Sequence, residues 1–185
     1  MIGNDLVDLN LALPEKKAKN LRYQEKVFLA GEIDEIKASL DPERSLWRFW
    51  SMKECAYKAS QRDTRFRRKL NPLDFKCEIQ KDSTGLVHTK NATYKVYSEI
   101  ESNYIHSYTI SESFRPSVIY HLDISKQEKL AAIAAALGLS KALVNIEKDS
   151  LGIPCLRLGS TPKSFPISMS HHGNFSAFLI PLINS

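Results

Sequence analysis

A carboxylate and an ammonium group stand four residues apart in this chain, at Glu54 and Lys58. On a helix, residues with this spacing share one face. A carboxylate can hold a hard metal ion and a lysine can neutralise phosphate charge, and both parts serve transfer of a phosphoryl-type group. The same spacing also fits an ordinary exposed ion pair, which stabilises a helix by only about 0.3–0.5 kcal/mol.

The helix that would carry this pair is predicted from residue periodicity. No Gly or Pro occurs from residue 45 to residue 60. One arc of this helix is apolar and should face the core: Leu46, Phe49, Met52, Ala56 and Ala59. A second arc is an aromatic wall that leads to the charged pair: Trp47, Trp50, Glu54 and Lys58.

The N-terminus supplies two further carboxylates. Ile2 and Leu6 indicate a short buried strand, with Asp5 in the strand and Asp8 at its exit. Gly3 permits a close approach of another backbone. In the alternative interpretation, Asp8 caps the next helix and Asp5 lies in a turn.

The C-terminus supplies hydroxyls and imidazoles. Ser168 and Ser170 alternate with apolar residues, which predicts a half-buried strand that runs into a His171-His172-Gly173-Asn174 turn. A second alternating strand then begins at Phe175. Such a turn could meet a phosphate group, or it could be a plain hairpin whose histidines face water.

The remaining pattern mixes helices with strands. We expect helical structure over residues 18–38 with a division at Gly31, a break at Asp41-Pro42, a turn at Thr84-Gly85 and a helix over residues 126–137 that ends at Gly138. Strands are expected over residues 75–79, 87–96, 105–110 and 117–122.

Composition is that of a compact globular chain rather than a membrane protein. The chain has 185 residues, of which 43% are hydrophobic, and no apolar stretch approaches the length of a membrane span. The N-terminus has no signal-peptide pattern. Three cysteines without metal-ligand spacing fit a reducing cytoplasm.

Charge suggests the kind of partner. The net charge is +5, and two basic clusters stand out: Lys16, Lys17, Lys19, Arg22 and Lys26, then Arg62, Arg65, Arg67, Arg68 and Lys69. Basic clusters attract phosphates or acidic proteins, although each can also be a solvated face. Because zinc spacing, helix-turn-helix signals and aromatic-basic strands are all missing from the sequence, we expect no nucleic-acid partner.

Three motifs together resemble the 4′-phosphopantetheinyl transferases: Gly3-x-Asp5, Trp50-x-x-Lys53-Glu54-x-x-x-Lys58 and Ser168-x-Ser170-His171. Their order is that of the small holo-acyl-carrier-protein synthases, although those chains are shorter. The resemblance implies an α+β fold in which an antiparallel sheet packs on helices. Residues 1–122 resemble one complete module with the metal-binding motifs, and residues 123–185 resemble a second, partial module with the Ser-His strand. A short internal echo, residues 81–85 against 148–152, is consistent with two related modules.

The resemblance also implies an activity. The family moves 4′-phosphopantetheine from coenzyme A to a serine of an apo acyl or peptidyl carrier protein, with Mg²⁺, and releases adenosine 3′,5′-bisphosphate. By resemblance, Asp5 and Glu54 would hold the metal, and Lys58 would contact the phosphates and help the leaving group depart. Glu54, or a water on the metal, would take the serine proton, and Ser170 and His171 would bind coenzyme A. The early basic cluster would meet the acidic carrier, which could serve fatty-acid synthesis or another pathway.

Two departures from the family pattern leave a second function open. Ile153 stands where the larger class of the family has the lysine of a Gly-Lys-Pro segment. Val7 stands where that class has a further carboxylate, whereas Asp8 matches the acidic position of the small class. A catalytically weak relative that binds coenzyme A or a carrier without transfer is the alternative. Whether one chain suffices or the site is shared in a homo-oligomer is also open.

Overall fold

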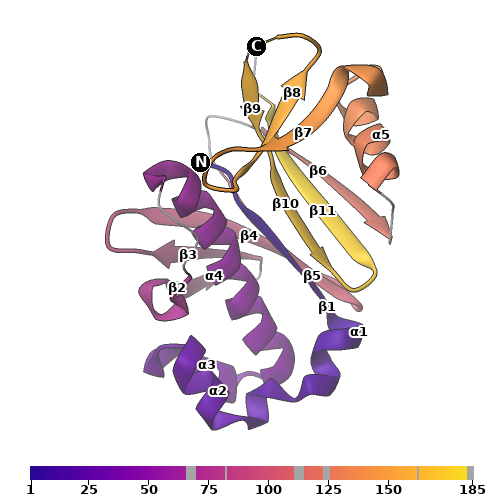
Figure 1. Cartoon of the computed structure of the whole chain (residues 1–185). Helices are drawn as coiled ribbons and strands as arrows, with labels where there is room; N and C mark the ends of the chain where they lie inside the picture. The colour runs from indigo at the N-terminus through magenta and orange to yellow at the C-terminus, as the bar shows by residue number, and fades with distance from the viewer. Residues whose placement is uncertain (66–69, 82, 111–114, 123–125, 162, 183–185) are drawn as a thin grey trace.

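A five-stranded antiparallel sheet crossed by one long helix dominates the N-terminal part of this computed structural model (Figure 1). The structure describes residues 1–65, 70–81, 83–110, 115–122, 126–161 and 163–182. The strand order is β1-β5-β4-β3-β2, in which β1 spans Asn4–Asp8, β2 Lys76–Lys81, β3 Thr84–His88, β4 Thr93–Ile100 and β5 Tyr104–Thr109. Four helices precede β2: α1 (Leu9–Ala12), α2 (Leu21–Val27), α3 (Ala30–Ala38) and α4 (Pro42–Thr64). Short 3-10 turns cover Leu13–Glu15, Lys17–Lys19 and Pro72–Asp74.

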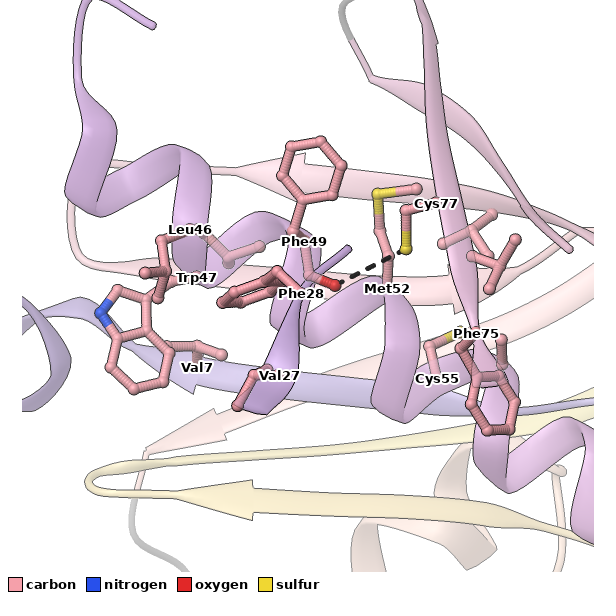
Figure 2. Packing of buried hydrophobic residues seen from close by; sticks show 14 of the residues in the cluster. Val7, Val27, Phe28, Leu46, Trp47, Phe49, Met52, Cys55, Phe75 and Cys77 are labelled. Carbon is pink, nitrogen blue, oxygen red and sulfur yellow. Dashed lines mark hydrogen bonds between the residues drawn. The ribbon is translucent and has the colours of Figure 1, made fainter. Parts of the chain in front are cut away.

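Helix α4 forms where the sequence predicts it. Asp41 caps its first turn by accepting a hydrogen bond from the Arg44 N–H at 3.0 Å, and Pro42 occupies the first helical position. The predicted core arc is buried against the sheet: Leu46, Phe49, Met52, Ala56 and Ala59 are at most 1% exposed. Figure 2 shows part of this packing, in which the Cys77 thiol also contacts the Phe49 carbonyl.

Strand β1 lies directly beneath α4 because Gly3 has no side chain. A Cβ on Gly3 would overlap the Cys55 carbonyl and the Ala59 amide of the helix. The Cys55 thiol donates to the Gly3 carbonyl at 3.3 Å, and its burial raises the thiol pKa. Cys55 is therefore a buried packing residue and not a thiolate nucleophile.

A buried ion pair fixes the far side of α4. The Lys53 ammonium lies 2.8 Å from Glu32 of α3, and the two side chains are 0% and 3% exposed. Lys53 also donates to the carbonyls of Pro72 and Phe75, which lead into β2. Glu32 in turn accepts from the Cys77 N–H at 2.7 Å. Lys53 therefore joins α3, α4 and β2, and it is separate from the arc that carries Glu54 and Lys58.

The C-terminal part contains two three-stranded antiparallel sheets and one helix (Figure 1). One sheet has the order β10-β11-β6, in which β6 is Arg115–Leu122, β10 Ser168–His172 and β11 Phe175–Leu182. The other has the order β7-β8-β9, in which β7 is Val144–Lys148, β8 Pro154–Leu158 and β9 Ser164–Pro166. Helix α5 (Lys126–Ala136) and the 3-10 turn Lys141–Leu143 complete this part, which has its own apolar core around Ile133, Leu156, Ile167 and Phe178.

Strand β6 belongs by pairing to the C-terminal part. It lies before the predicted boundary at residue 122, yet it pairs along its whole length with β11. The two-module division at residues 122 and 123 stays a prediction. The internal echo between residues 81–85 and 148–152 includes Asp82, which lies outside the described residues.

The structure corrects three element predictions. The helical stretch 18–38 divides at Phe28 and Leu29, because the Glu32 carboxylate accepts from the Leu29 N–H at 2.8 Å and starts a new helix there; Gly31 lies inside α3. The expected strand 87–96 is instead two strands joined by a turn, in which the Thr89 hydroxyl accepts from the Asn91 and Ala92 N–H groups. Thr84 and Gly85 lie in β3, not in a turn.

The predicted fold class, α+β with antiparallel sheets packed on helices, is confirmed. Among the residues that the structure describes, no helix has both the length and the apolar character needed to cross a membrane.

Candidate active site

Asp5 and Lys58 meet where β1 passes under α4. The Lys58 ammonium donates to the Asp5 carboxylate at 2.9 Å and to the Asn4 carbonyl, also at 2.9 Å. Glu54 lies one helical turn before Lys58, and the charges of Asp5 and Lys58 both act on its carboxyl group. The structure thus brings together the three residues that the sequence selected from two distant segments.

A pocket of about 520 Å³ opens beside this cluster. Its charged and imidazole lining comes from four parts of the chain: Asp5, Glu15, Lys17, Glu54, His171 and His172. Its remaining walls are apolar or aromatic: Leu6, Val7, Tyr23, Trp47 and Trp50. The tryptophan arc of α4 is therefore a pocket wall, as its spacing indicated.

The pocket disfavours negative charge on Glu54. Burial, and then the charge of Asp5, raise the Glu54 pKa from 4.5 to about 7, although Lys58 acts in the opposite direction. Burial, and then the charges of Glu15 and Glu54, also raise the pKa of Tyr23 to about 12, so the phenol stays neutral. Because the two carboxylates repel each other in a pocket that is partly shielded from water, a bound cation would stabilise them.

Asn4 is the residue that sequence reasoning missed. Its backbone N–H donates to the Ser168 hydroxyl, and its side-chain amide donates to the Ser170 hydroxyl, both at 3.0 Å. The amide also lies 3.1 Å from Nε2 of His106, whose pKa burial lowers to about 3. Neutral His106 thus accepts from Asn4, and Asn4 ties β1 to β10. The only sequence signal was its place between Gly3 and Asp5.

The two predicted coenzyme A ligands are placed differently. The His171 ring is exposed and lines the pocket, with Nδ1 3.0 Å from the Ser176 hydroxyl. Ser170 is 9% exposed, and its hydroxyl accepts from Asn4. In this structure, His171 is thus the member of the pair that faces the pocket, and His172, which we had not selected, lines it as well.

Asp8 caps helix α1, as the alternative interpretation expected, whereas Asp5 lies in β1 and not in a turn. It is 1% exposed, and its carboxylate accepts hydrogen bonds from the N–H groups of Asn10 and Asn174. Its charge is therefore satisfied by backbone amides.

A second pocket, of about 340 Å³, lies at the other end of α4, beside Ile153 and Pro154. Ile153 is 4% exposed, so its side chain is part of the wall. The cations of this pocket are Arg62, which donates to the Pro154 carbonyl at 3.1 Å, and Arg65, which lies 3.0 Å from Asp149. The rest of that basic cluster, Arg67, Arg68 and Lys69, lies outside the described residues.

The donor set at Asp5 and Glu54 suits a hard divalent cation. Both side chains line one pocket and offer carboxylate oxygens, the ligands that Mg²⁺ prefers, and Mg²⁺ commonly takes only one or two protein carboxylates. Among the described residues, no group of three or more His, Cys, Asp and Glu side chains gathers as a metal site. The remaining ligands would therefore be water or substrate oxygens.

The part of the chain that carries this site matches a known protein family. A family model described as the 4′-phosphopantetheinyl transferase superfamily matches residues 1–115, which contain Asp5, Glu54 and Lys58. Comparison with curated proteins gives no significant match. Among solved structures, the chain is similar to holo-acyl-carrier-protein synthase of Helicobacter pylori in complex with coenzyme A, at 17% sequence identity and a TM-score of 0.29. That alignment covers 98% of this chain and 100% of the other.

Proposed function

Because this chain belongs to the 4′-phosphopantetheinyl transferase superfamily, we propose that it transfers 4′-phosphopantetheine from coenzyme A to a serine of an apo carrier protein. The reaction would depend on Mg²⁺ and release adenosine 3′,5′-bisphosphate, in the manner of a holo-acyl-carrier-protein synthase. The observation that carries the proposal is the grouping of Asp5, Glu54 and Lys58: both carboxylates line one pocket, and Lys58 is paired with Asp5. Binding of a ligand does not by itself require two carboxylates and a lysine in this arrangement.

Asp5 and Glu54 would hold the metal ion. When bound, Mg²⁺ would supply positive charge that stabilises the charge growing on the phosphoryl oxygens and on the departing phosphate. Lys58, already 2.9 Å from Asp5, would neutralise a phosphate oxygen and favour departure of the leaving group. His171 and Ser170 would bind coenzyme A phosphate, with His171 as the residue that faces the pocket.

Glu54 is also the candidate base. Its pKa of about 7 in the metal-free protein lets it exchange a proton near neutral pH. The serine hydroxyl of the carrier would lose its proton to Glu54 as its oxygen attacks the phosphorus that bears the pantetheine arm. The neighbouring Tyr23 keeps its proton near neutral pH, so it would not act as the base.

The early basic cluster would receive the acidic carrier. Lys16, Lys19, Arg22 and Lys26 are exposed, and Lys17 lines the pocket. Leu11 and Leu21 beside them are 53% and 52% exposed, which adds apolar contact area. A carrier bound here would present its serine at the mouth of the pocket.

The alternative function, binding without transfer, is favoured by one observation. Ile153 is buried and offers no cation where the larger class has its lysine. Arg62 and Arg65 bring positive charge to the pocket of about 340 Å³ that Ile153 lines, and we propose that they bind the anionic end of coenzyme A in place of the missing lysine.

We expect the reaction to take place in a reducing cytoplasm, since all three cysteines are free thiols.

The deciding experiment is a mass spectrum of an apo acyl carrier protein after incubation with this protein, coenzyme A and Mg²⁺. Transfer adds one phosphopantetheine group, about 340 Da, and EDTA should prevent the gain. Asp5→Ala and Glu54→Ala should abolish it while the protein stays folded. Binding of coenzyme A without a mass gain across several carriers would support the alternative, and full activity of either variant would remove the metal assignment.

A further inference from the structure

The Asp8 carboxylate makes one local and one long-range hydrogen bond at the end of β1. Its Oδ1 accepts from the Asn10 N–H at 2.9 Å, at the start of α1. Its Oδ2 accepts from the Asn174 N–H at 3.1 Å, at the tip of the β10–β11 hairpin. Because the acceptor is charged and 1% exposed, each of these hydrogen bonds is stronger than one between neutral groups.

The backbone at Asp8 binds the same hairpin. The Asp8 N–H donates to Nδ1 of His172 at 3.0 Å. Gly173 follows with φ +54, and a Cβ at that position would overlap Oδ2 and Cβ of Asp8. The hairpin tip can therefore approach Asp8 this closely only because residue 173 is a glycine.

Asp8 does not line the pocket, although Asp5, Leu6 and Val7 of the same strand do. Its two oxygens are directed at backbone amides rather than at the space beside Glu54. The hairpin presents two residues to the pocket, His171 and His172, and the second of them is the one that the Asp8 N–H binds.

We propose that Asp8 is a positioning residue that holds the hairpin tip and thereby fixes His171 at the pocket, and that it is not a ligand of the metal. The inference rests on the proposed function only where it concerns coenzyme A. The contacts that carry it lie in the chain itself.

Asp8→Asn tests the proposal with little change in shape. The amide NH₂ cannot accept a hydrogen bond, so only one of the two backbone N–H groups keeps its acceptor. We expect hydrogen exchange at the Asn174 or Asn10 amide to speed up by roughly tenfold or more, and coenzyme A to bind about tenfold more weakly. The KM for coenzyme A should rise more than kcat falls, and the Mg²⁺ concentration for half-maximal activity should stay as in the wild type.

Gly173→Ala displaces the hairpin while leaving the Asp8 carboxylate intact. It should weaken coenzyme A binding like Asp8→Asn, and the two changes together should do little more than either alone, since both act on one contact. Gly138→Ala is the matched control: this glycine has φ +65, but a Cβ there would meet nothing within 4 Å. If Asp8→Asn does not fold, Gly173→Ala carries the test.

Two results would overturn the inference. One is a rise in the Mg²⁺ requirement of Asp8→Asn as large as that of Asp5→Asn. The other is unchanged exchange at both the Asn10 and Asn174 amides. If the wild-type protein transfers nothing, the proposed function fails, but the amide exchange of Asp8→Asn and Gly173→Ala still decides the role of Asp8.

Discussion

Glu54 is held where its charged form is disfavoured, and this has a consequence for stability. Its ordinary pKa of 4.5 is raised to about 7 in the folded, metal-free protein, chiefly by burial and then by Asp5. Between these two values the folded state keeps a proton that the unfolded state has lost. Stability from this group is therefore fully present below the lower value and falls as pH rises through the window.

Replacing Glu54 by glutamine should accordingly stabilise the metal-free protein at about pH 8 by roughly 1–2 kcal/mol, with little effect at about pH 4. The gain should be lower than the full pKa shift implies, because Glu54 retains some contact with water. Urea unfolding of Glu54→Gln in EDTA at the two pH values measures it. Glu25→Gln, at an exposed position on α2, is the control, and an equal gain at both pH values would contradict the argument.

Residue types and spacing were enough to select Asp5, Glu54 and Lys58, because two of them share a helix face and the third lies in a short motif. Asn4 could not be found in this way. Its partners, His106, Ser168 and Ser170, lie more than 100 positions away in the chain, and only folding brings them to one residue. The assignment of roles to Asp5, Glu54, Lys58, Ser170 and His171 stays a prediction.

At the scale of elements, long helices were predicted better than short strands. Helix α4 has a cap, a first-turn proline and a consistent apolar periodicity, so its local signals agree. The β3–β4 turn has no Gly or Pro, and it is closed instead by the hydroxyl of Thr89. We therefore predicted one continuous strand across this turn, because the turn contains no Gly or Pro.

Arg62 joins the end of α4 to the C-terminal part. Its guanidinium donates to the carbonyl of Pro154, at the start of β8, and to that of Ile167, directly before β10. Burial lowers its pKa to about 10, so it stays charged at neutral pH. We expect Arg62→Met to destabilise the protein by about 1–3 kcal/mol, because two carbonyls lose a charged donor.

Urea unfolding measures this effect as well. Arg22→Met, at an exposed position on α2, provides the comparison and should change stability by less than about 0.5 kcal/mol. An equal effect of the two substitutions would show that the Arg62 hydrogen bonds do not hold the elements together.

The segment from Lys16 to Lys26 should control binding of the carrier protein and not binding of coenzyme A. A double charge reversal, Lys19→Glu with Arg22→Glu, is expected to raise the KM for an acidic carrier about tenfold at low salt. The effect should shrink at about 1 M salt, where the screening length is about 3 Å, and the KM for coenzyme A should not change.

A charge reversal elsewhere provides the control for this surface. Lys90→Glu changes an exposed lysine in the turn between β3 and β4, and it should leave the KM for the carrier unchanged. If Lys90→Glu raised that KM as much as a single Lys19→Glu substitution, net charge rather than this surface would control binding.

At the scale of the whole molecule, the first strand and the last described hairpin of the chain meet within one copy. Strand β1 at the N-terminus lies beside the C-terminal hairpin of β10 and β11 (Figure 1), and four hydrogen bonds at Asn4 and Asp8 join them. The sequence left open whether Asp5 and Glu54 meet His171 of the same chain or of a neighbour. The geometry favours the same chain.

This arrangement predicts the outcome of a mixing experiment. Asp5→Ala and His171→Ala should each lose most transferase activity, and a mixture of the two purified variants should stay inactive, because neither chain then contains a complete pocket. A site shared between copies would instead recover activity on mixing, since one of the mixed sites would pair an intact Asp5 with an intact His171. The mixture should be unfolded and refolded together before the assay, so that slow exchange of subunits cannot imitate a single-chain site.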